Sequence, residues 1–425
     1  MEEGFQLYVG IDWATQAHQV CLMNREGKTL EEFAVDHTGA ALSQFAQHLM
    51  RLCKGHPEQV AVAIETPRGA VVEMLVERGF AVFAINPKQL DRFRDRHTVA
   101  GAKDDRRDAF VLADSVRTDQ HCFRRVRLDD PLIIQIRELS RVDEDLCREE
   151  SRLSNRLRDL LHRFFPQMVE LSSPPDDAWL WELLERAPTP EKASRLRAQA
   201  VEKILRKHRI RRLRAEEVLS KLKTSPLPVA PGVVEACSAH VALLLPRLRL
   251  VHEQRQRSEK HLEDLLGKAG TQETAEAEKR EHRDVEILRS LPGVGRLVTA
   301  AMLAEASQPL GERDYQALRS YAGVAPVTKS SGKRSGKRSI IVMRRACNPR
   351  LRRAVYHWTR VSVQKDPYSK SLYAALRQRG HHHGRALRGV GDRLLRVLVS
   401  MLQHGTLYDP QRLRRPSLVP AGMTA

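Results

Sequence analysis

The chain has 425 residues, of which 41% are hydrophobic, 29% charged and 5% aromatic. This hydrophobic fraction excludes global disorder, and the length predicts more than one domain. Lys and Arg number 72 against 53 Asp and Glu, which gives a net charge of +19. Such an excess favours nucleic acid as the partner, because Lys and Arg that bind phosphates release condensed counterions. A basic surface without such a partner is the alternative.

The six cysteines are scattered and form no C-x-x-C pair. This pattern predicts neither a disulfide framework nor a zinc site, so we expect reduced thiols. The first residues lack the basic and apolar regions of a signal peptide, and the apolar stretch around Val241–Leu245 is far too short to cross a bilayer. The expectation is a cytoplasmic protein with no membrane partner.

Residues 1–127 are predicted to form an α/β domain. Apolar runs at 7–14 and 18–24 predict an antiparallel strand pair, and those at 59–67 and 79–87 predict two further strands. The segments 41–53 and 70–79 have the apolar spacing of helices. Alternation of this kind predicts helices packed on a mixed sheet.

Residues 128–284 are predicted to form a coiled-coil arm. One apolar stripe consists of Leu139, Leu146, Leu153 and Leu160, widened by Ile136, Val142, Leu157 and Phe164. A second consists of Leu244, Leu248, Val251, Leu262 and Leu265, interrupted by Arg255 and Ser258. The two helices are expected to pair with each other or across a subunit boundary. Between them lies a small helical insert, about 172–242, whose basic segment 203–214 either contacts nucleic acid or is a solvated helix face.

Residues 285–405 are predicted to be mostly helical, and 406–425 to be a tail. The sequence around PGVG at 292–295 predicts a helix-hairpin-helix, in which backbone N–H groups at the start of the second helix can hold a phosphate. Three adjacent histidines, 381–383, are poorly spaced for one metal ion, so we expect a loop that contacts nucleic acid. Tyr321 and Tyr356 are interpreted as packing residues.

Four carboxylates are placed to bind metal. Asp12 and Glu65 end predicted strands, and Asp105 and Asp108 lie three apart at a predicted helix start. Four converging carboxylates can hold two Mg²⁺ ions, or Mn²⁺, which clamp the attacking and leaving oxygens of a phosphodiester. The alternative is that each acid only ends a strand or caps a helix, which is our interpretation of Asp104 and Asp114.

A basic segment follows in the predicted C-terminal domain. Residues 329–360 contain eleven Lys or Arg and no Asp or Glu. The candidate nucleic-acid-binding residues are Lys329, Lys333, Arg334, Lys337, Arg338, Arg344 and Arg345. The sequence SSGKRSGKRS either is a solvated loop that adds phosphate affinity or delivers a hydroxyl nucleophile to a phosphodiester.

Four motifs carry a family resemblance. They are G-I-D-W-A at 10–14, I-E-T-P at 64–67, K-D-D-R-R-D-A at 103–109 and Y-A-G-V-A-P-V-T-K-S-S-G at 321–332. Together they resemble the DEDD-type transposases of the insertion sequence 110 family. The resemblance implies a RuvC-like, RNase H-like fold for the N-terminal domain, with Asp12, Glu65, Asp105 and Asp108 as its four catalytic metal-binding acids. The family usually has Thr or Asn where this chain has Asp104, so Asp104 is an alternative to Asp105.

The same resemblance implies the chemistry and the partners. Ser331 corresponds to a serine nucleophile that forms a covalent phosphoserine intermediate, with Ser330 and Ser335 as alternates. The implied protein is a bacterial DNA recombinase that is associated with the nucleoid when active. It acts as a tetramer, or dimer of dimers, with a structured non-coding guide RNA that pairs with donor and target DNA. The rivals are a RuvC-like nuclease that uses no serine, an actin-like ATPase and an architectural nucleic-acid-binding protein. The chain has no second phosphate loop for the ATPase, and the four acids argue against an architectural protein.

Overall fold

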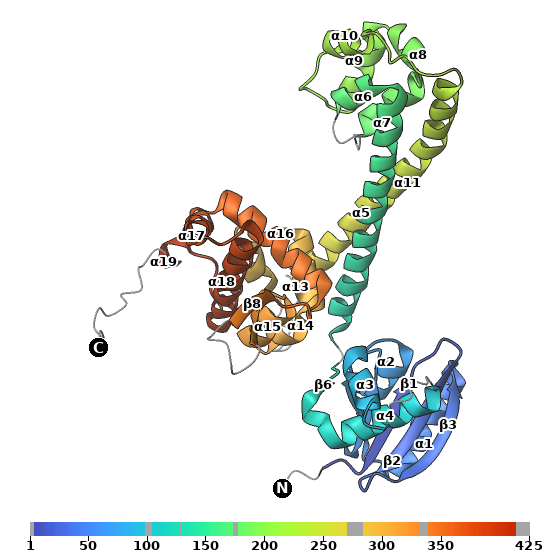
Figure 1. Cartoon of the computed structure of the whole chain (residues 1–425), viewed down its shortest axis with the longest axis vertical. Coiled ribbons are helices and arrows are strands. Elements are labelled where there is room, and N and C mark those ends of the chain that lie inside the picture. Colours follow the sequence, from blue (N-terminus) through green and yellow to red (C-terminus); the bar gives the residue numbers. More distant parts are fainter. Residues whose placement is uncertain are drawn as a thin grey trace, which may run out of the picture. The chain divides into compact units, whose positions relative to one another are not determined.

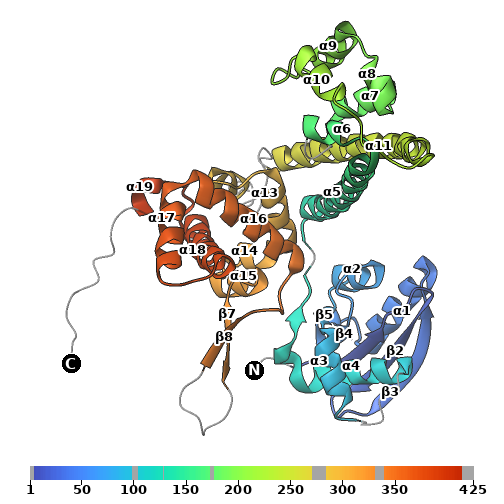
Figure 2. The same cartoon turned by 45° about the horizontal axis from the view of Figure 1, so that its top comes forward.

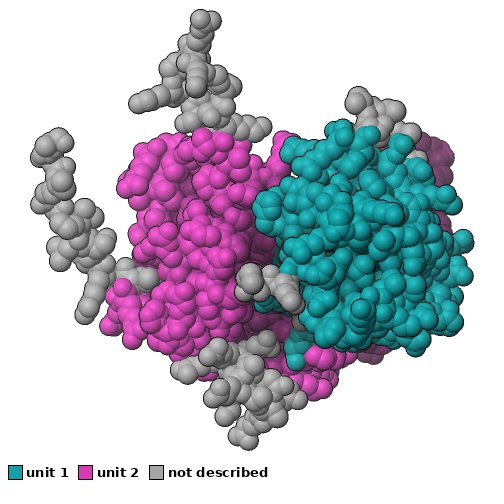
Figure 3. All heavy atoms as spheres, turned by 90° about the horizontal axis from the view of Figure 1, so that it is seen from below, with its two compact units in different colours: residues 1–130 teal, residues 131–425 magenta. Residues whose placement is uncertain are grey.

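The computed structural model describes residues 4–97, 104–127, 129–172, 177–269, 284–330 and 339–413. They belong to two compact units, Met1–Asp130 and Pro131–Ala425, which Figure 3 distinguishes by colour. The first unit is mixed α/β and the second is mostly helical, as the sequence predicts. In the described part of the chain, no helix combines the length and hydropathy needed to cross a bilayer.

The first unit is built on one sheet with the strand order β3-β2-β1-β4-β5-β6 (Figure 1). The strands are β1 (Leu7–Asp12), β2 (Ala17–Asn24), β3 (Thr29–Asp36), β4 (Val60–Ile64), β5 (Ala81–Ala84) and β6 (Arg124–Arg125). β2 is antiparallel to β1, whereas β4 is parallel to β1 and β5 is parallel to β4. The four predicted strands are confirmed. β3 was not predicted, because this edge strand buries only Val35 and otherwise alternates partly buried and exposed residues.

Helices cover both faces of this sheet (Figures 1 and 2). The four helices are α1 (Gly39–Leu52), α2 (Ala70–Glu77), α3 (Pro87–Arg94) and α4 (Asp105–Asp119). α1 and α2 pack on the face that carries Val9 and Ile11. α3 and α4 pack on the opposite face, which carries Tyr8. Successive strand residues point to opposite faces, so both faces of β1 are buried and the unit has three layers.

Two long helices of the second unit pack side by side (Figure 1). They are α5 (Pro131–Phe164) and α11 (Val233–Lys268). Leu153, Leu157 and Leu161 of α5 share a core with Leu244 and Leu248 of α11. The predicted pairing of the two helices is confirmed, and their coiled-coil geometry stays a prediction.

One predicted stripe position on α5 is wrong. Val142 is 48% exposed, whereas the neighbouring Asp143 is buried. Further along the same face, the buried Glu150 accepts hydrogen bonds from Arg255, at 2.6 Å, and lies 2.6 Å from Nδ1 of His252, both on α11. The contact face therefore passes through charged residues here, and a search for apolar residues alone places it incorrectly.

Five short helices join the two long ones and form the predicted insert (Figure 1). They are α6 (Pro166–Leu171), α7 (Ala178–Arg186), α8 (Pro190–Ser194), α9 (Ala198–Lys207) and α10 (Ala215–Leu222). Their core surrounds the buried Trp179 and Trp181 and continues into the paired helices. Only the first part of the basic segment 203–214 is helical, since α9 ends at Lys207.

Most of the remaining described helices form a second core with the start of α5 and the end of α11. They are a helix at 284–290 followed by α13 (Arg296–Glu305), α14 (Ser307–Gly311), α15 (Tyr315–Tyr321), α16 (Pro349–Lys365), α17 (Pro367–Gln378), α18 (His383–His404) and α19 (Pro410–Leu413). The predicted tail includes a docked part, because the N–H of Tyr408 donates to Ser290 Oγ at 3.0 Å and its ring packs against the core.

The PGVG segment makes the predicted turn between two helices. Gly293 has φ = +83°, and a Cβ there would lie 3.0 Å from the backbone nitrogen of Ser362. Trp358 Nε1 and Ser362 Oγ, both on α16, donate to the carbonyl of Pro292 at 3.1 and 2.6 Å. The turn is thus packed against α16, and its predicted contact with phosphate stays a prediction.

A β-hairpin extends from these helices (Figure 2). It consists of β7 (Pro326–Ser330) and β8 (Ser339–Met343), which are antiparallel. The sequence analysis expected a loop here and did not predict the strands. Each strand has only five residues, and charge and hydroxyl groups dominate the surrounding segment, which hides the β-branched positions such as Val327 and Val342.

Candidate active site

Asp12 is the last residue of β1, and Glu65 comes directly after β4, the parallel neighbour of β1. Ile11 of β1 lies opposite Ile64 of β4 in the register, so the next residue on each strand is one of the two acids. Adjacent strands are about 4.8 Å apart, which brings both carboxylates to one edge of the sheet. Both residues are partly exposed. The strand ends therefore present two acids side by side to a ligand.

Helix α4 runs antiparallel to β1 and brings its first turn to the same edge. A Cβ built on Gly10 would lie 1.9 Å from the carbonyl oxygen of Ala109. Arg117, near the other end of α4, approaches Gly27 in the turn after β2. That turn follows Asn24, the partner of Leu7 at the start of β1. The start of α4, with Asp105 and Asp108, therefore lies toward the Asp12 end of the strand.

The first acids of this segment have different local roles. Asp104 is the N-cap of α4, and its side chain accepts a hydrogen bond from the N–H of Arg106 at 3.3 Å. Asp105 is exposed in the first turn, whereas Asp108 is 7% exposed. The cap contact agrees with our interpretation of Asp104 as a capping acid.

A neighbouring arginine balances the buried charge of Asp108. Arg94 of α3 donates from Nε to Asp108 Oδ1 at 2.7 Å and from a terminal nitrogen to Asp91 at 2.8 Å. Burial alone would lower the pKa of Arg94, but the hydrogen bond and the charge of Asp108 outweigh it and raise that pKa. The sequence analysis missed Arg94, because its contact with α4 depends on how α3 packs.

Asp114 lies away from this cluster on α4. It accepts from Arg117 at 2.6 Å and forms an ion pair with His97 at 3.3 Å. These contacts agree with the structural role expected for it.

The donor set at the sheet edge fits hard divalent cations. Asp12, Glu65, Asp105 and Asp108 offer only carboxylate oxygens, the ligands that Mg²⁺ and Mn²⁺ prefer. Among the described residues, no three of these acids have carboxylate oxygens within 4.8 Å of one another. Neighbouring carboxylates repel each other unless a cation lies between them. The residues present therefore suit a metal-assisted reaction at a phosphate.

Replacing Gly10 with alanine should displace α4. The added methyl group would collide with the backbone of Ala109 and Ala113, which cannot move aside as a side chain can. We expect the free energy of unfolding of the whole chain to fall by about 1–3 kcal/mol. Urea titration followed by circular dichroism measures it. An Ala substitution at the exposed Gly39, where a Cβ meets no atom within 4 Å, is the matched control.

The candidate nucleophile lies outside the described residues, as does most of the basic loop. Ser331, Ser335, Lys333, Arg334, Lys337 and Arg338 belong to the segment 331–338. β7 and β8 place the two ends of this segment opposite each other, with Ser330 paired to Ser339. Arg344 and Arg345 follow β8, where Arg344 is partly buried and Arg345 is exposed.

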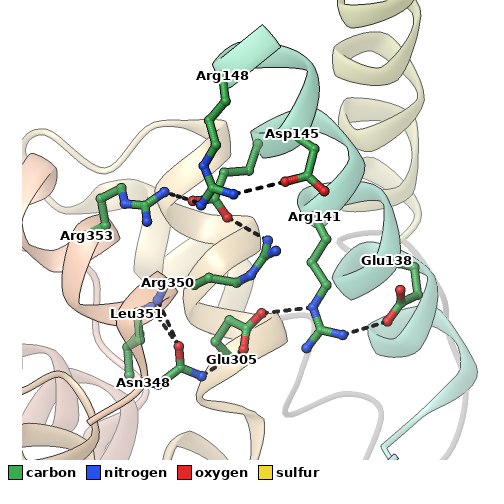
Figure 4. A network of polar contacts seen from close by, with 10 residues as sticks. Glu138, Arg141, Asp145, Arg148, Glu305, Asn348, Arg350, Leu351 and Arg353 are labelled. Atoms are coloured by element: carbon green, nitrogen blue, oxygen red, sulfur yellow. Dashed lines mark hydrogen bonds and ion pairs between the residues drawn. The ribbon is translucent and has the colours of Figure 1, made fainter. Parts of the chain in front are cut away.

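A polar network fixes the base of this hairpin (Figure 4). Asn348 caps α16 by accepting from the N–H groups of Arg350 and Leu351. Its side chain donates to Glu305 at 2.8 Å, and Glu305 also accepts from Arg141 of α5 at 3.3 Å. The end of the hairpin is thereby tied to α13 and α5.

Glu144 forms a second tie between α5 and α16. Its carboxylate is paired with Arg350 at 2.6 Å, with Arg148 at 2.7 Å and with Arg353. The sequence analysis missed both ties, because their partners on α16 lie about two hundred positions further along the chain.

Two family models match the chain. One, a DEDD-type model described as a transposase, matches residues 9–166. The other, described as the transposase IS116/IS110/IS902 family, matches residues 285–374. The first spans the acids and the second includes the hairpin and α16.

Similar proteins agree with these matches. A protein of Streptomyces coelicolor, named as the mini-circle transposase for IS117, is 31% identical to this chain over 99% of both chains. The 43.6 kDa protein of insertion element IS110 from the same species is 32% identical over 76% of this chain and 74% of its own length. Protein y4uE of Sinorhizobium fredii, whose name also refers to a transposase, is 48% identical over 49% of this chain and 58% of its own length. The chain belongs to the IS110 family of insertion-sequence transposases.

Proposed function

We propose that this chain cuts and rejoins DNA strands as the recombinase of an insertion sequence. The observation that carries the proposal is that Asp12 and Glu65 lie side by side at the ends of adjacent parallel strands, with the start of α4 toward the same sheet edge. Membership of the family supports the DNA substrate. Incubation with donor and target DNA and the copurified RNA in Mg²⁺ tests it, and joined products are the expected result.

Asp12, Glu65, Asp105 and Asp108 would hold the divalent cations. Bound Mg²⁺ would polarise the phosphodiester and stabilise charge on its attacking and leaving oxygens. The cap contact of Asp104 supports Asp105 as the third acid. The hydrogen bond from Arg94 would orient the Asp108 carboxylate.

Ser331 would supply the nucleophile. Its Oγ gives up a proton and attacks phosphorus, so a phosphoserine ester forms and the bond from phosphorus to one sugar oxygen breaks. That sugar oxygen takes a proton and leaves as a hydroxyl group. In the joining step, a hydroxyl from the exchanged strand attacks the same phosphorus and the serine hydroxyl is restored. The hairpin supports this role, since the antiparallel strands β7 and β8 extend from the helices and end at Ser330 and Ser339, on either side of the segment 331–338.

The basic surface would bind both DNA and RNA. Lys329, Lys333, Arg334, Lys337 and Arg338 lie in or beside the loop, and Arg344 and Arg345 follow it. We propose that a structured non-coding RNA acts as the guide. The PGVG turn would contact phosphate as a helix-hairpin-helix. The protein would act as a tetramer in which α5 and α11 form coiled-coil contacts. Sequencing of the RNA that copurifies with the protein tests the guide, and light scattering tests the tetramer.

A RuvC-like nuclease without serine chemistry is the second candidate. The acid cluster favours it, because four carboxylates and metal suffice to activate water. It leaves the serines and the basic side chains of the hairpin segment unused, and it predicts no covalent protein–DNA adduct.

Binding to nucleic acid should weaken steeply with salt. The chain carries a net charge of +19, and each phosphate that its Lys and Arg neutralise releases counterions. If six to ten phosphates are contacted, the affinity should fall roughly 10³–10⁵-fold between 50 and 200 mM salt. Fluorescence anisotropy with a labelled duplex measures this slope. A nearly flat slope would contradict the assignment of a nucleic-acid partner.

A further inference from the structure

A cavity of about 390 Å³ lies at the base of the β7–β8 hairpin, among residues of α16, the start of α18 and the turn after α15. We call it the hairpin-base pocket. Apolar side chains that line it include Val324, Met343, Val355 and Leu387, and its cationic side chains are Arg352, Arg353 and Arg388. None of the described residues that line it is acidic.

The positive charge in this pocket is only partly balanced. Arg353 is paired with Glu144, and Arg352 donates to the backbone carbonyls of Arg344 and Arg345. Within the described ranges, Arg388 has no acidic partner. Burial, together with the charges of Arg352 and Arg385, lowers its pKa. Positive charges that are partly buried close together destabilise a fold unless an anion binds between them. The arginines of this pocket therefore favour binding of a phosphate group.

An exposed aromatic ring lies at the same pocket. Tyr356, interpreted from the sequence as a packing residue, is 42% exposed, and Met343 is 43% exposed. That interpretation of Tyr356 is therefore wrong, because this position of α16 faces the pocket rather than the core. Exposed aromatic and apolar surface beside arginines is the combination that holds an unpaired base and its phosphate.

We propose that the hairpin-base pocket holds one unstacked nucleotide of the DNA strand that is cut. Its base lies against Tyr356 and Met343, and its phosphate lies beside Arg352 and Arg388. The choice of DNA rests on the proposed function. β8 covers about 13 Å from Ser339 to Met343, or about four stacked nucleotides, so a DNA strand bound at the end of the hairpin reaches the pocket.

Three substitutions distinguish binding in this pocket from a general effect of positive charge on DNA affinity. Tyr356→Ala removes the stacking surface. Gly384→Phe fills the pocket, and an added Cβ there meets only the end of Arg388 at 3.6 Å, an ordinary contact, so the fold should tolerate it. Arg388→Gln removes a pocket charge, and its matched control is Arg360→Gln, which removes an equal charge from an exposed position of α16 that does not line the pocket.

The test uses the full chain, without divalent metal, and a fifteen-residue oligothymidylate that carries one 5-iodouracil. Light should crosslink this DNA to the peptide that contains Tyr356 or Met343, and Gly384→Phe should abolish that crosslink. We expect Tyr356→Ala and Gly384→Phe to weaken binding roughly 5- to 100-fold. Arg388→Gln should weaken it several-fold more than Arg360→Gln. Circular dichroism checks that each variant is folded.

Specific results would overturn the proposal. Unchanged affinity in both Tyr356→Ala and Gly384→Phe would do so, as would a crosslink at this peptide with oligouridylate but not with the DNA. The assay is independent of the serine chemistry, because it needs neither metal nor cleavage. A pocket crosslink in a protein that forms no covalent adduct with a cleavable substrate would leave the pocket assigned and reject only the proposed reaction.

Discussion

Replacing Ser331 with alanine should abolish covalent attachment to DNA and reduce recombination by at least about a thousandfold, a loss of about 4 kcal/mol of transition-state stabilisation. Alanine has no hydroxyl to attack phosphorus, whereas the substitution leaves every Lys and Arg of the basic segment in place. With a nicked suicide substrate, the unmodified protein should yield an adduct that survives denaturing electrophoresis. Mass spectrometry should place the phosphate on the peptide around residues 330–333.

The neighbouring serines provide matched controls. Ser330→Ala and Ser335→Ala remove the same group from the same segment and should retain the adduct. An adduct that disappears only in one of these variants would move the nucleophile to that serine. Full cleavage and joining by a protein that lacks all three hydroxyls would instead support the nuclease.

Asp12→Asn and Glu65→Gln should each abolish strand cleavage in Mg²⁺, again by roughly a thousandfold or more, while the affinity for DNA is retained. Each change removes a charge from the sheet edge without changing the size of the side chain, so β1 and β4 keep their packing. The Lys and Arg that contact phosphates are untouched. A gel assay of cleavage, beside anisotropy for binding, measures the two effects separately.

Other acids near this edge test whether the effect is specific. Asp36 ends β3 at the same edge but two strands away from Asp12, so Asp36→Asn should retain activity. Asp104→Asn should also retain activity, because asparagine caps a helix as well as aspartate does. Asp105→Asn should lose cleavage activity. Cleavage at the normal rate by Asp12→Asn would refute the metal site.

The parts of the fold that depend on local pattern could be predicted from the sequence. The β1, β2, β4 and β5 runs are short and apolar, and α1 and α2 show a clear helical period. Asp12 and Glu65 lie at the ends of such runs, so their positions at strand ends could be predicted from the sequence alone. The capping role of Asp104 was also accessible, because N-caps depend on the next few residues only.

Predictions failed where the stabilising contacts are distant in sequence. Val142 was assigned to the contact face of α5, but that face passes through the buried Asp143 and Glu150, and Arg255 of α11 donates to Glu150. β3 and the β7–β8 hairpin were missed because their polar residues conceal a strand whose pairing is decided by its neighbours. Tyr356 was assigned to the core and instead lines a pocket.

The sequence by itself determined the family, the strand-end acids and the basic segment that holds Ser331, because motifs and charge are properties of neighbouring residues. The tertiary structure decided how α4 crosses β1. The backbone at position 10 can approach Ala109 so closely only because glycine has no side chain. It also decided that Arg94 holds Asp108 and that Glu144 and Glu305 anchor α16 to α5. These contacts join separate segments, and they form only when packing brings the partners together in less polar surroundings, where the attraction between them is stronger than in water.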